Sequence, residues 1–412
     1  MNKDDVKFKI INSEPDIWGI VGPNYSGKSY LLNHLFTEIG NNALLIDENG
    51  VARSINIKNK VKISGDLYVY EDALSRGRSR VENESYQITV KSKNIIDQVN
   101  QTINSIGRDK SSMGVRKIIN ILDALLQHNL NNLKYILIDE PENFLDDLNF
   151  KNISNIFKIL KDNSLKVIFV THNPRFLELM KIKTDNLFIL THMHSDIINI
   201  HENSVMKLFN ETNLAISTDQ SVCFTNAPKF DRLKFLMPPK MLSIYLRQFL
   251  SSTEFYQSIF YNKVVIVEGK SEKVVIQKND SLPILMNNFV YSYGKLFIPF
   301  LVKFYQTIGK SIIVLMDNDQ SKIFYKNLGD YIIQNILLKN DRYHIFDDDL
   351  ETFLNLGNDV ISDLVSDYGE SISPDDLKNQ GYFKPFFCEH AINLNSQLNE
   401  KVTKLIEALN EK

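Results

Sequence analysis

The feature that most constrains this chain is the segment 22–29, GPNYSGKS, which fits the pattern G-x-x-x-x-G-K-[ST] at every fixed position. An apolar run at residues 17–21 precedes it, and apolar spacing typical of a helix follows at residues 30–36. A strand, a glycine loop and a helix in this order cradle phosphates, because backbone N–H groups and the helix N-terminus face the anion. A chance glycine turn is the alternative. We predict a nucleoside triphosphate site formed by these residues: Gly22, Asn24, Gly27, Lys28, and Ser29 with its hydroxyl on Mg²⁺.

Two later strand ends carry side chains suited to the same chemistry. The apolar run 135–138 ends in Asp139 and Glu140, and the run 167–171 ends at His172. We expect Asp139 to hold the Mg²⁺ shell, Glu140 to polarise the attacking water and His172 to contact the γ-phosphate. The alternative is that the two acids only cap a strand and that the histidine is a surface residue.

Ser112 and Gly114 stand at the start of a predicted amphipathic helix between these two parts. Small residues at a helix N-terminus can grip an anionic phosphate. A serine before a helix is more often simply its N-cap. The order of the motifs favours a nucleotide-binding role for Ser112 and Gly114.

Length and composition set broad limits. The 412 residues allow two to three domains, and the net charge of −3 gives no global basic field for nucleic acid. Cys223 and Cys388 form no metal or redox spacing. The charged N-terminus has no signal peptide pattern, and no apolar run approaches a membrane span. We expect a cytoplasmic protein with no membrane partner.

A second alternation of strands and helices begins near residue 264. The apolar run 264–267 ends in Glu268, with Glu272 following, and the run 311–316 ends in Asp317 and Asp319. A glutamate at the exit of a buried strand is unfavourable unless it binds a cation or a proton. Carboxylates that converge from neighbouring strand ends make an oxygen-rich site for Mg²⁺. A purely structural role is the alternative.

The first half resembles an ABC-type ATPase head of the compact class shared with DNA-repair and SMC-like proteins. Lys28 and Ser29 match its Walker A motif, Asp139 and Glu140 its Walker B motif, and His172 its switch histidine. Ser112 and Gly114 match an abbreviated signature, with Val115 where glutamine is usual. The resemblance implies ATP as the ligand and pairing of two heads. Three glutamines compete for the Q-loop position: Gln87, Gln98 and Gln101.

The second half resembles a Toprim domain, and a head followed by Toprim resembles the OLD (overcoming lysogenization defect) family of nucleases. The turn at Gly294 and Lys295 fits a loop of that family. The resemblance implies that Glu351 is a further acid and Lys384 a catalytic lysine. Three neighbouring acids compete with Glu351: Asp347, Asp348 and Asp349.

On this reading the carboxylates hold two divalent ions, Mg²⁺ or Mn²⁺, that clamp the attacking and leaving oxygens of a phosphodiester. Lys384 would offset charge on the phosphate being cut. Lys270, Lys273 and Lys295 could meet a nucleic-acid backbone, although exposed lysines are solvated by default. The expected metal ligands are Glu268, Glu272, Asp317, Asp319 and Glu351, with Glu268 also counted as catalytic.

The expected fold is α/β. Residues 1–202 form an ABC-type ATPase head with a P-loop and a mixed sheet, 203–261 a linker or helical interface, and 262–412 a Toprim nuclease domain with a helical C-terminal cover. The expected function is that of an ATP-regulated, metal-dependent endonuclease or nickase that cuts nucleic acid, and we favour DNA over RNA as its substrate. The resemblance implies a homo-oligomer with a role in anti-phage defence. It also allows a second protein or nucleic-acid component of the defence system. The alternative is an ATP-dependent sensor or scaffold that binds without cutting and controls a partner effector.

Overall fold

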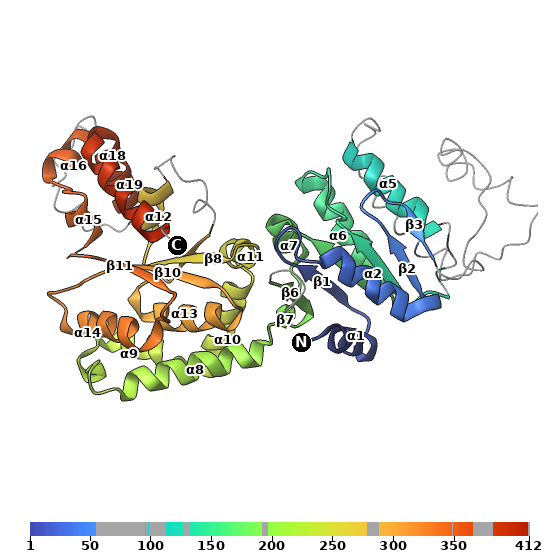
Figure 1. The fold of residues 1–412 in the computed structure, drawn as a ribbon, viewed down its shortest axis with the longest axis horizontal. Coiled ribbons are helices and arrows are strands. Elements are labelled where there is room, and N and C mark those ends of the chain that lie inside the picture. The colour runs from blue at the N-terminus through green and yellow to red at the C-terminus, as the bar shows by residue number, and fades with distance from the viewer. Residues whose placement is uncertain are drawn as a thin grey trace, which may run out of the picture. The chain divides into compact units, whose positions relative to one another are not determined.

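The computed structural model describes residues 1–54, 95, 98, 113–126, 128, 130, 132–191, 197–277, 288–347, 349–365 and 382–410. These residues divide into two compact units, Met1–Ile200 and His201–Lys412 (Figure 1). Ser112, Gln87, Gln101 and Asp348 lie outside the described residues.

Unit 1 is built on a seven-stranded mixed sheet in the order β3-β2-β4-β5-β1-β6-β7. The five inner strands are parallel, and β3 and β7 pair antiparallel at the two edges. All five inner strands are buried along their whole length, as continuous apolar runs in a parallel sheet should be. The strands are β1 (Ile17–Val21), β2 (Ala43–Ile46), β3 (Ala52–Arg53), β4 (Tyr135–Asp139), β5 (Lys166–Thr171), β6 (Leu187–Leu190) and β7 (Ile197–Asn199).

Helices cover both faces of this sheet (Figure 1). On one face, apolar residues of α1 and α2 join those of the inner strands in a single core. On the other, Phe157 and Phe176 of α6 and α7 pack on Phe169 of β5, with ring centroids 5.5–5.6 Å from it. The helices are α1 (Lys3–Asn12), α2 (Lys28–Ile39), α5 (Met113–Leu126), α6 (Asp147–Asp162) and α7 (Pro174–Met180), with 3-10 turns η1 (Gly40–Asn42) and η3 (Thr184–Asn186).

Unit 2 has a four-stranded parallel sheet in the order β11-β10-β8-β9. Leu315 of β10 lies opposite Val267 of β8, so these two strands end side by side. Glu268, which follows β8, and Asp317, the last residue of β10, are therefore neighbours at the carboxyl edge of the sheet. The strands are β8 (Lys263–Val267), β9 (Phe289–Tyr291), β10 (Ser311–Asp317) and β11 (Arg342–Phe346).

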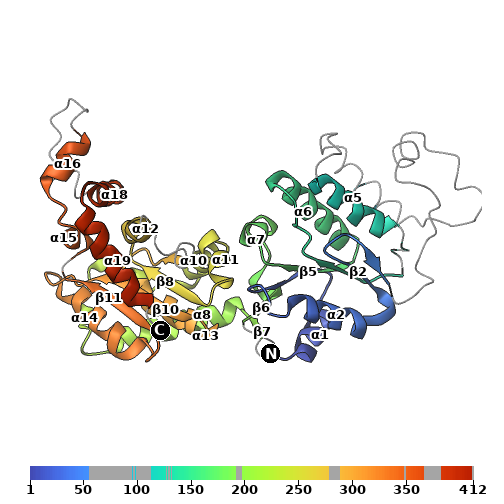
Figure 2. The ribbon, with the colours of Figure 1, turned by 45° about the horizontal axis from the view of Figure 1, so that its top comes forward.

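Figure 2 shows α12, α18 and α19 on one face of this sheet, and Figure 1 shows α8, α13 and α14 on the other. The first group shares an apolar core with the strands. The segment 203–261, expected as a linker, forms most of α8 and all of α9, α10 and α11, and belongs to unit 2. The first helices are α8 (Glu202–Thr218), η4 (Phe224–Asn226), α9 (Lys229–Phe235), α10 (Pro239–Leu250), α11 (Thr253–Ile259), α12 (Lys270–Gln277) and η6 (Lys295–Phe297). The later ones are α13 (Ile298–Thr307), α14 (Ile323–Tyr331), η7 (Ile332–Ile336), α15 (Leu350–Phe353), α16 (Asn358–Val365), α18 (Lys384–Leu394) and α19 (Ser396–Asn410).

Within the described part of the chain, every helix is too short or too polar to cross a membrane.

Candidate functional sites

The glycine loop of unit 1 joins β1 to α2, as the sequence predicts. Gly22 has φ 152°, and a Cβ there would lie 2.4 Å from the carbonyl oxygen of Leu190. Gly27 has φ 90° and is the N-cap of α2. Side chains are rare at such angles, so glycine is needed at both positions for the backbone to turn around an anion.

Lys28 points back into this loop. Its side chain is buried, and Nζ donates to the carbonyl oxygens of Gly22 (3.1 Å) and Pro23 (2.8 Å). Burial lowers the pKa of Lys28, and Glu140 and Asp139 partly oppose that shift. Asn24 and Ser29 are exposed. The amine thus lies among loop carbonyls at the place where a phosphate group would bind.

Asp139 ends β4 beside this loop and accepts a hydrogen bond from Ser29. Burial raises the pKa of the Asp139 carboxyl. Its Oδ1 is buried and has no hydrogen-bond partner among the described residues. A buried carboxylate oxygen of this kind, next to a serine hydroxyl, fits a Mg²⁺ ion that a nucleotide would bring.

Glu140 and His172 meet at the ends of the neighbouring strands β4 and β5. The His172 Nδ1 lies 2.9 Å from Glu140 Oε1, and Asn143 Nδ2 donates to Glu140 Oε2 at 2.6 Å. Glu140 has φ 43°, a left-handed conformation that strains a residue with a side chain. The arrangement fixes a carboxylate and an imidazole together at the same strand edge.

Two further side chains of unit 1 were not anticipated. Glu142 is buried, its pKa is raised to about 8 by burial, and it accepts a hydrogen bond from the Thr171 hydroxyl. Lys117 of α5 is buried and donates to the Asp47 and Glu48 carbonyls after β2. Both side chains connect segments distant in sequence to the loops around Asp139. No local sequence pattern predicts such contacts.

Gly114, near the start of α5, is packed against the turn that follows Glu140. A Cβ at Gly114 would lie 2.8 Å from the carbonyl oxygen of Phe144. This close approach gives the glycine a packing reason within the same chain. Ser112, predicted to act with Gly114, lies outside the described residues.

In unit 2 the first two predicted acids touch at the carboxyl edge of the sheet. The Asp317 backbone N–H donates to Glu268 Oε1 at 3.1 Å, and the Leu350 N–H donates to Asp317 Oδ1 at 3.1 Å. Asp319 has φ 51°, a strained left-handed conformation for a residue with a side chain. Its carboxylate lies in the turn directly after β10. These contacts bring the ends of β8 and β10 and the start of α15 together.

Glu272 and Glu351 complete the group that we call the acidic cluster. Both are buried, and Glu272 Oε2 accepts from the Gly269 N–H at 3.1 Å. Lys384 Nζ pairs with Glu351 Oε1 at 2.6 Å. The competing acid Asp349 instead caps α15 by accepting from the Thr352 N–H. The acidic cluster consists of Glu268, Glu272, Asp317, Asp319 and Glu351.

The carboxylates of the acidic cluster are poorly solvated and repel one another, and both effects raise their pKa values. Burial, followed by neighbouring carboxylates, raises the pKa of Asp317 to about 8. Burial also raises the pKa of Glu268 and of Glu272 to about 7, opposed at Glu268 by Lys295. Pairing with Glu351 raises the pKa of Lys384 against the opposite effect of burial. The cluster therefore favours additional positive charge or bound protons.

Lys295 fits neither of its two sequence interpretations, a nucleic-acid contact or a solvated lysine, because it is buried among the acids. Its side chain is 1% exposed, and Nζ lies 2.6 Å from Asp319 Oδ2 and 3.7 Å from Glu268 Oε1. It also donates to the Asp317 carbonyl oxygen. Lys273 lies over the Tyr291 ring, and Lys270 is exposed.

The donor set of the acidic cluster suits a hard divalent cation, since all its side chains are carboxylates. Nevertheless, no three Asp, Glu, His or Cys side chains among the described residues already stand at the spacing of a metal site. Binding of Mg²⁺ or Mn²⁺ would therefore need the carboxylates to turn toward the ion.

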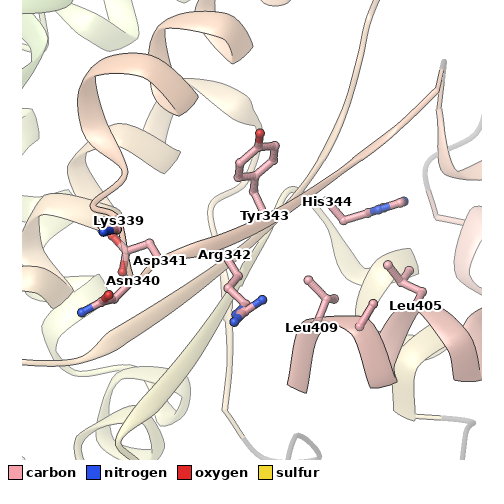
Figure 3. A pocket seen from close by; sticks show the side chains of 9 residues that line it. Lys339, Asn340, Asp341, Arg342, Tyr343, His344, Leu405 and Leu409 are labelled. Atoms are coloured by element: carbon pink, nitrogen blue, oxygen red, sulfur yellow. The ribbon is translucent and has the colours of Figure 1, made fainter. Parts of the chain in front are cut away.

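A cavity of about 330 Å³ lies elsewhere in unit 2, where α19 passes the amino end of β11 (Figure 3). The acidic cluster lies at the opposite, carboxyl end of the sheet, so this cavity is separate from it. Its lining residues are Lys339, Asn340, Asp341, Arg342, Tyr343, His344, Leu405, Ala408 and Leu409.

Comparisons with known proteins bear on the ATPase half. A family described as "AAA domain, putative AbiEii toxin, Type IV TA system" matches residues 90–178, a range that includes Gly114, Asp139, Glu140 and His172. The "Putative ABC transporter ATP-binding protein" of Pyrococcus furiosus is 26% identical over 215 residues, which are 48% of this chain and 73% of that protein.

Two solved structures also align. A structure titled "An inward-facing conformation of a putative metal-chelate type ABC transporter" is 20% identical over 47% of this chain and 75% of its own, with a TM-score of 0.30. The SMC head domain of Thermotoga maritima is 20% identical over 45% and 91%, with a TM-score of 0.24.

The family match and the sequence relative support an AAA/ABC-type ATPase domain in this chain. With the mixed sheet of unit 1, they confirm the expected α/β ATPase head. They do not show the OLD family, a Toprim domain or a nuclease.

Proposed function

We propose that this protein is an ATP-regulated, divalent-metal-dependent endonuclease or nickase, with ATP bound in unit 1 and nucleic acid, preferably DNA, cut at unit 2. The single observation that carries the nuclease half is the convergence of five carboxylates, with Lys384 beside them, at the ends of adjacent parallel strands. Grouping five acids, two of them buried and three half-buried, is unfavourable for folding alone. A cation site explains why they are there.

In unit 1, the loop N–H groups and Lys28 would bind the ATP phosphates, and Ser29 with Asp139 would hold the accompanying Mg²⁺. Glu140, fixed by His172 and Asn143, would accept a proton from the attacking water. His172 would then lie close to the γ-phosphate. The relative's name, an ABC transporter ATP-binding protein, supports ATP as the ligand.

In unit 2, Mg²⁺ or Mn²⁺ would supply Lewis-acid activation of a phosphodiester. Glu272, Asp317 and Glu351 would hold it, with Glu268 and Asp319 beside them. Lys384 remains charged because of its ion pair with Glu351, so it can stabilise the phosphate being cut or the leaving oxygen.

We further propose that two chains pair through their ATPase heads and that the protein acts in anti-phage defence, with or without a second component. The matched family is named for a toxin of a toxin–antitoxin system, which agrees with a role in such conflicts.

A plasmid-nicking assay tests the nuclease proposal. Full-length protein with Mg²⁺ or Mn²⁺, with and without ATP, should convert supercoiled plasmid to nicked or linear forms. The double variant Asp317→Ala, Asp319→Ala should not. A matched double variant at two exposed acids of unit 2, Asp330→Ala and Glu407→Ala, should cut as the wild type does. Equal cutting by both double variants would overturn the proposal.

A second candidate function is an ATP-dependent sensor or scaffold whose unit 2 binds without cutting and controls a partner effector. It is favoured by the absence, among the described residues, of a ready three-ligand metal site. Recovery of a stoichiometric partner, together with no cutting in any divalent ion, would support it over the nuclease.

A further inference from the structure

Lys295 is held in the acidic cluster by the backbone as well as by its charge. The Gly294 N–H donates to the Glu268 carbonyl oxygen at 3.1 Å, which fixes the start of η6 against the end of β8. Gly294 has φ 111°, a conformation that favours glycine at this turn. The lysine side chain is buried, so it cannot move into solvent without rearranging this turn.

The ammonium group of Lys295 has the surroundings of a bound cation. Three oxygens from two strand ends surround it: Asp319 Oδ2 at 2.6 Å, Glu268 Oε1 at 3.7 Å and the Asp317 carbonyl oxygen. The second lysine of the cluster, Lys384, pairs instead with Glu351. A divalent ion near Glu268 and Asp319 would therefore lie directly against a fixed positive charge.

We propose that Lys295 is a built-in cation that takes the place of one of two divalent ions, so that unit 2 binds a single ion. That ion is bound by Asp317, Glu272 and Glu351. Lys295 acts through Glu268 and Asp319, which it neutralises and holds, and is therefore a positioning residue. This inference rests on the metal site of the proposed function and replaces the two-ion arrangement expected from the sequence.

The test is a count of Mn²⁺ ions bound per full-length chain without nucleotide, measured by the electron paramagnetic resonance of free Mn²⁺. Lys295→Met should bind one more ion than the wild type, because the same carboxylates lose a competing charge. Lys310→Met is the matched control. Lys310 is also buried but donates to the Ile259 carbonyl oxygen, so its loss should leave the count unchanged. Lys295→Arg, which keeps the charge, should bind the wild-type number.

An equal or lower count in Lys295→Met would overturn the inference. If Lys295→Met folds only in Mn²⁺, its melting temperature should rise more steeply with Mn²⁺ concentration than that of the wild type. An equal rise in the two proteins would also overturn the inference. Asp317→Asn separates this result from failure of the proposed function. If Asp317→Asn binds as many ions as the wild type, unit 2 has no metal site; if it loses one while Lys295→Met gains none, only the role of Lys295 is wrong.

Discussion

Removing divalent cations at alkaline pH should destabilise unit 2. The pKa of Asp317 is raised to about 8, and those of Glu268 and Glu272 to about 7, by burial and by the other carboxylates. The folded unit thus keeps protons that the unfolded chain releases above about pH 4. Because the folded pKa values are raised, their contribution to stability is complete at low pH and is lost as pH rises through the folded values.

The size of the effect follows from proton linkage. Each pH unit over which the folded state holds one extra proton lowers the free energy of unfolding by about 1.4 kcal/mol. Between pH 6 and pH 8, Asp317 alone should lower it by about 2.5 kcal/mol. For a unit of this size the melting temperature should fall by roughly 5–10 °C. Glu268 and Glu272 act in the same direction up to about pH 7.

Thermal melts in EDTA at pH 6 and pH 8, repeated with Mg²⁺, measure this change. Mg²⁺ should remove the part of the fall that comes from unit 2, because a divalent cation there stabilises the ionised carboxylates. Glu142 of unit 1, whose pKa is raised to about 8, gives a similar dependence that Asp317→Asn leaves in place. The variant should therefore lose only the unit 2 part. A fall that is undiminished in Asp317→Asn, or unaffected by Mg²⁺, would refute the reasoning.

Three further substitutions test single groups. Gly22→Ala should destabilise unit 1 by roughly 1–3 kcal/mol, because its Cβ would clash with the Leu190 carbonyl oxygen at φ 152°; unchanged denaturation midpoints would contradict this. Glu140→Gln should keep ATP binding but slow hydrolysis by roughly 10²–10⁴-fold, measured by phosphate release, and full activity would exclude Glu140 as the base. Lys384→Met should lower nicking by about 10²-fold or more while Mn²⁺ still binds, and an unchanged cutting rate would remove Lys384 from the chemistry.

The parts of the fold that repeat a local pattern could be predicted from the sequence. The predicted strand, glycine loop and helix are present as β1, the loop after it and α2. The acids that follow apolar runs lie at strand ends. Parallel strands bring their carboxyl ends to one edge, so the meeting of Asp139 with Ser29, and of Glu268 with Asp317, follows from the order of elements alone.

Contacts that depend on burial could not be predicted. The sequence indicates an exposed lysine after a glycine turn at Lys295. Hydrogen bonds of Ser292 and Gly294 to the end of β8 place that lysine inside the acidic cluster. Glu142 and Lys117 are likewise ordinary charges in the sequence. Their roles depend on strands and loops brought together by long-range packing, for which a single sequence carries no periodic signal.

The most direct test of the account is anomalous diffraction from crystals of the full chain grown with Mn²⁺ and a non-hydrolysable ATP analogue. The account predicts one Mn²⁺ peak in the acidic cluster, in contact with the carboxylate of Asp317, and another beside Ser29 and Asp139. A peak only at the nucleotide, with the acidic cluster holding no ion, would contradict the claim that unit 2 is a metal-dependent catalytic site.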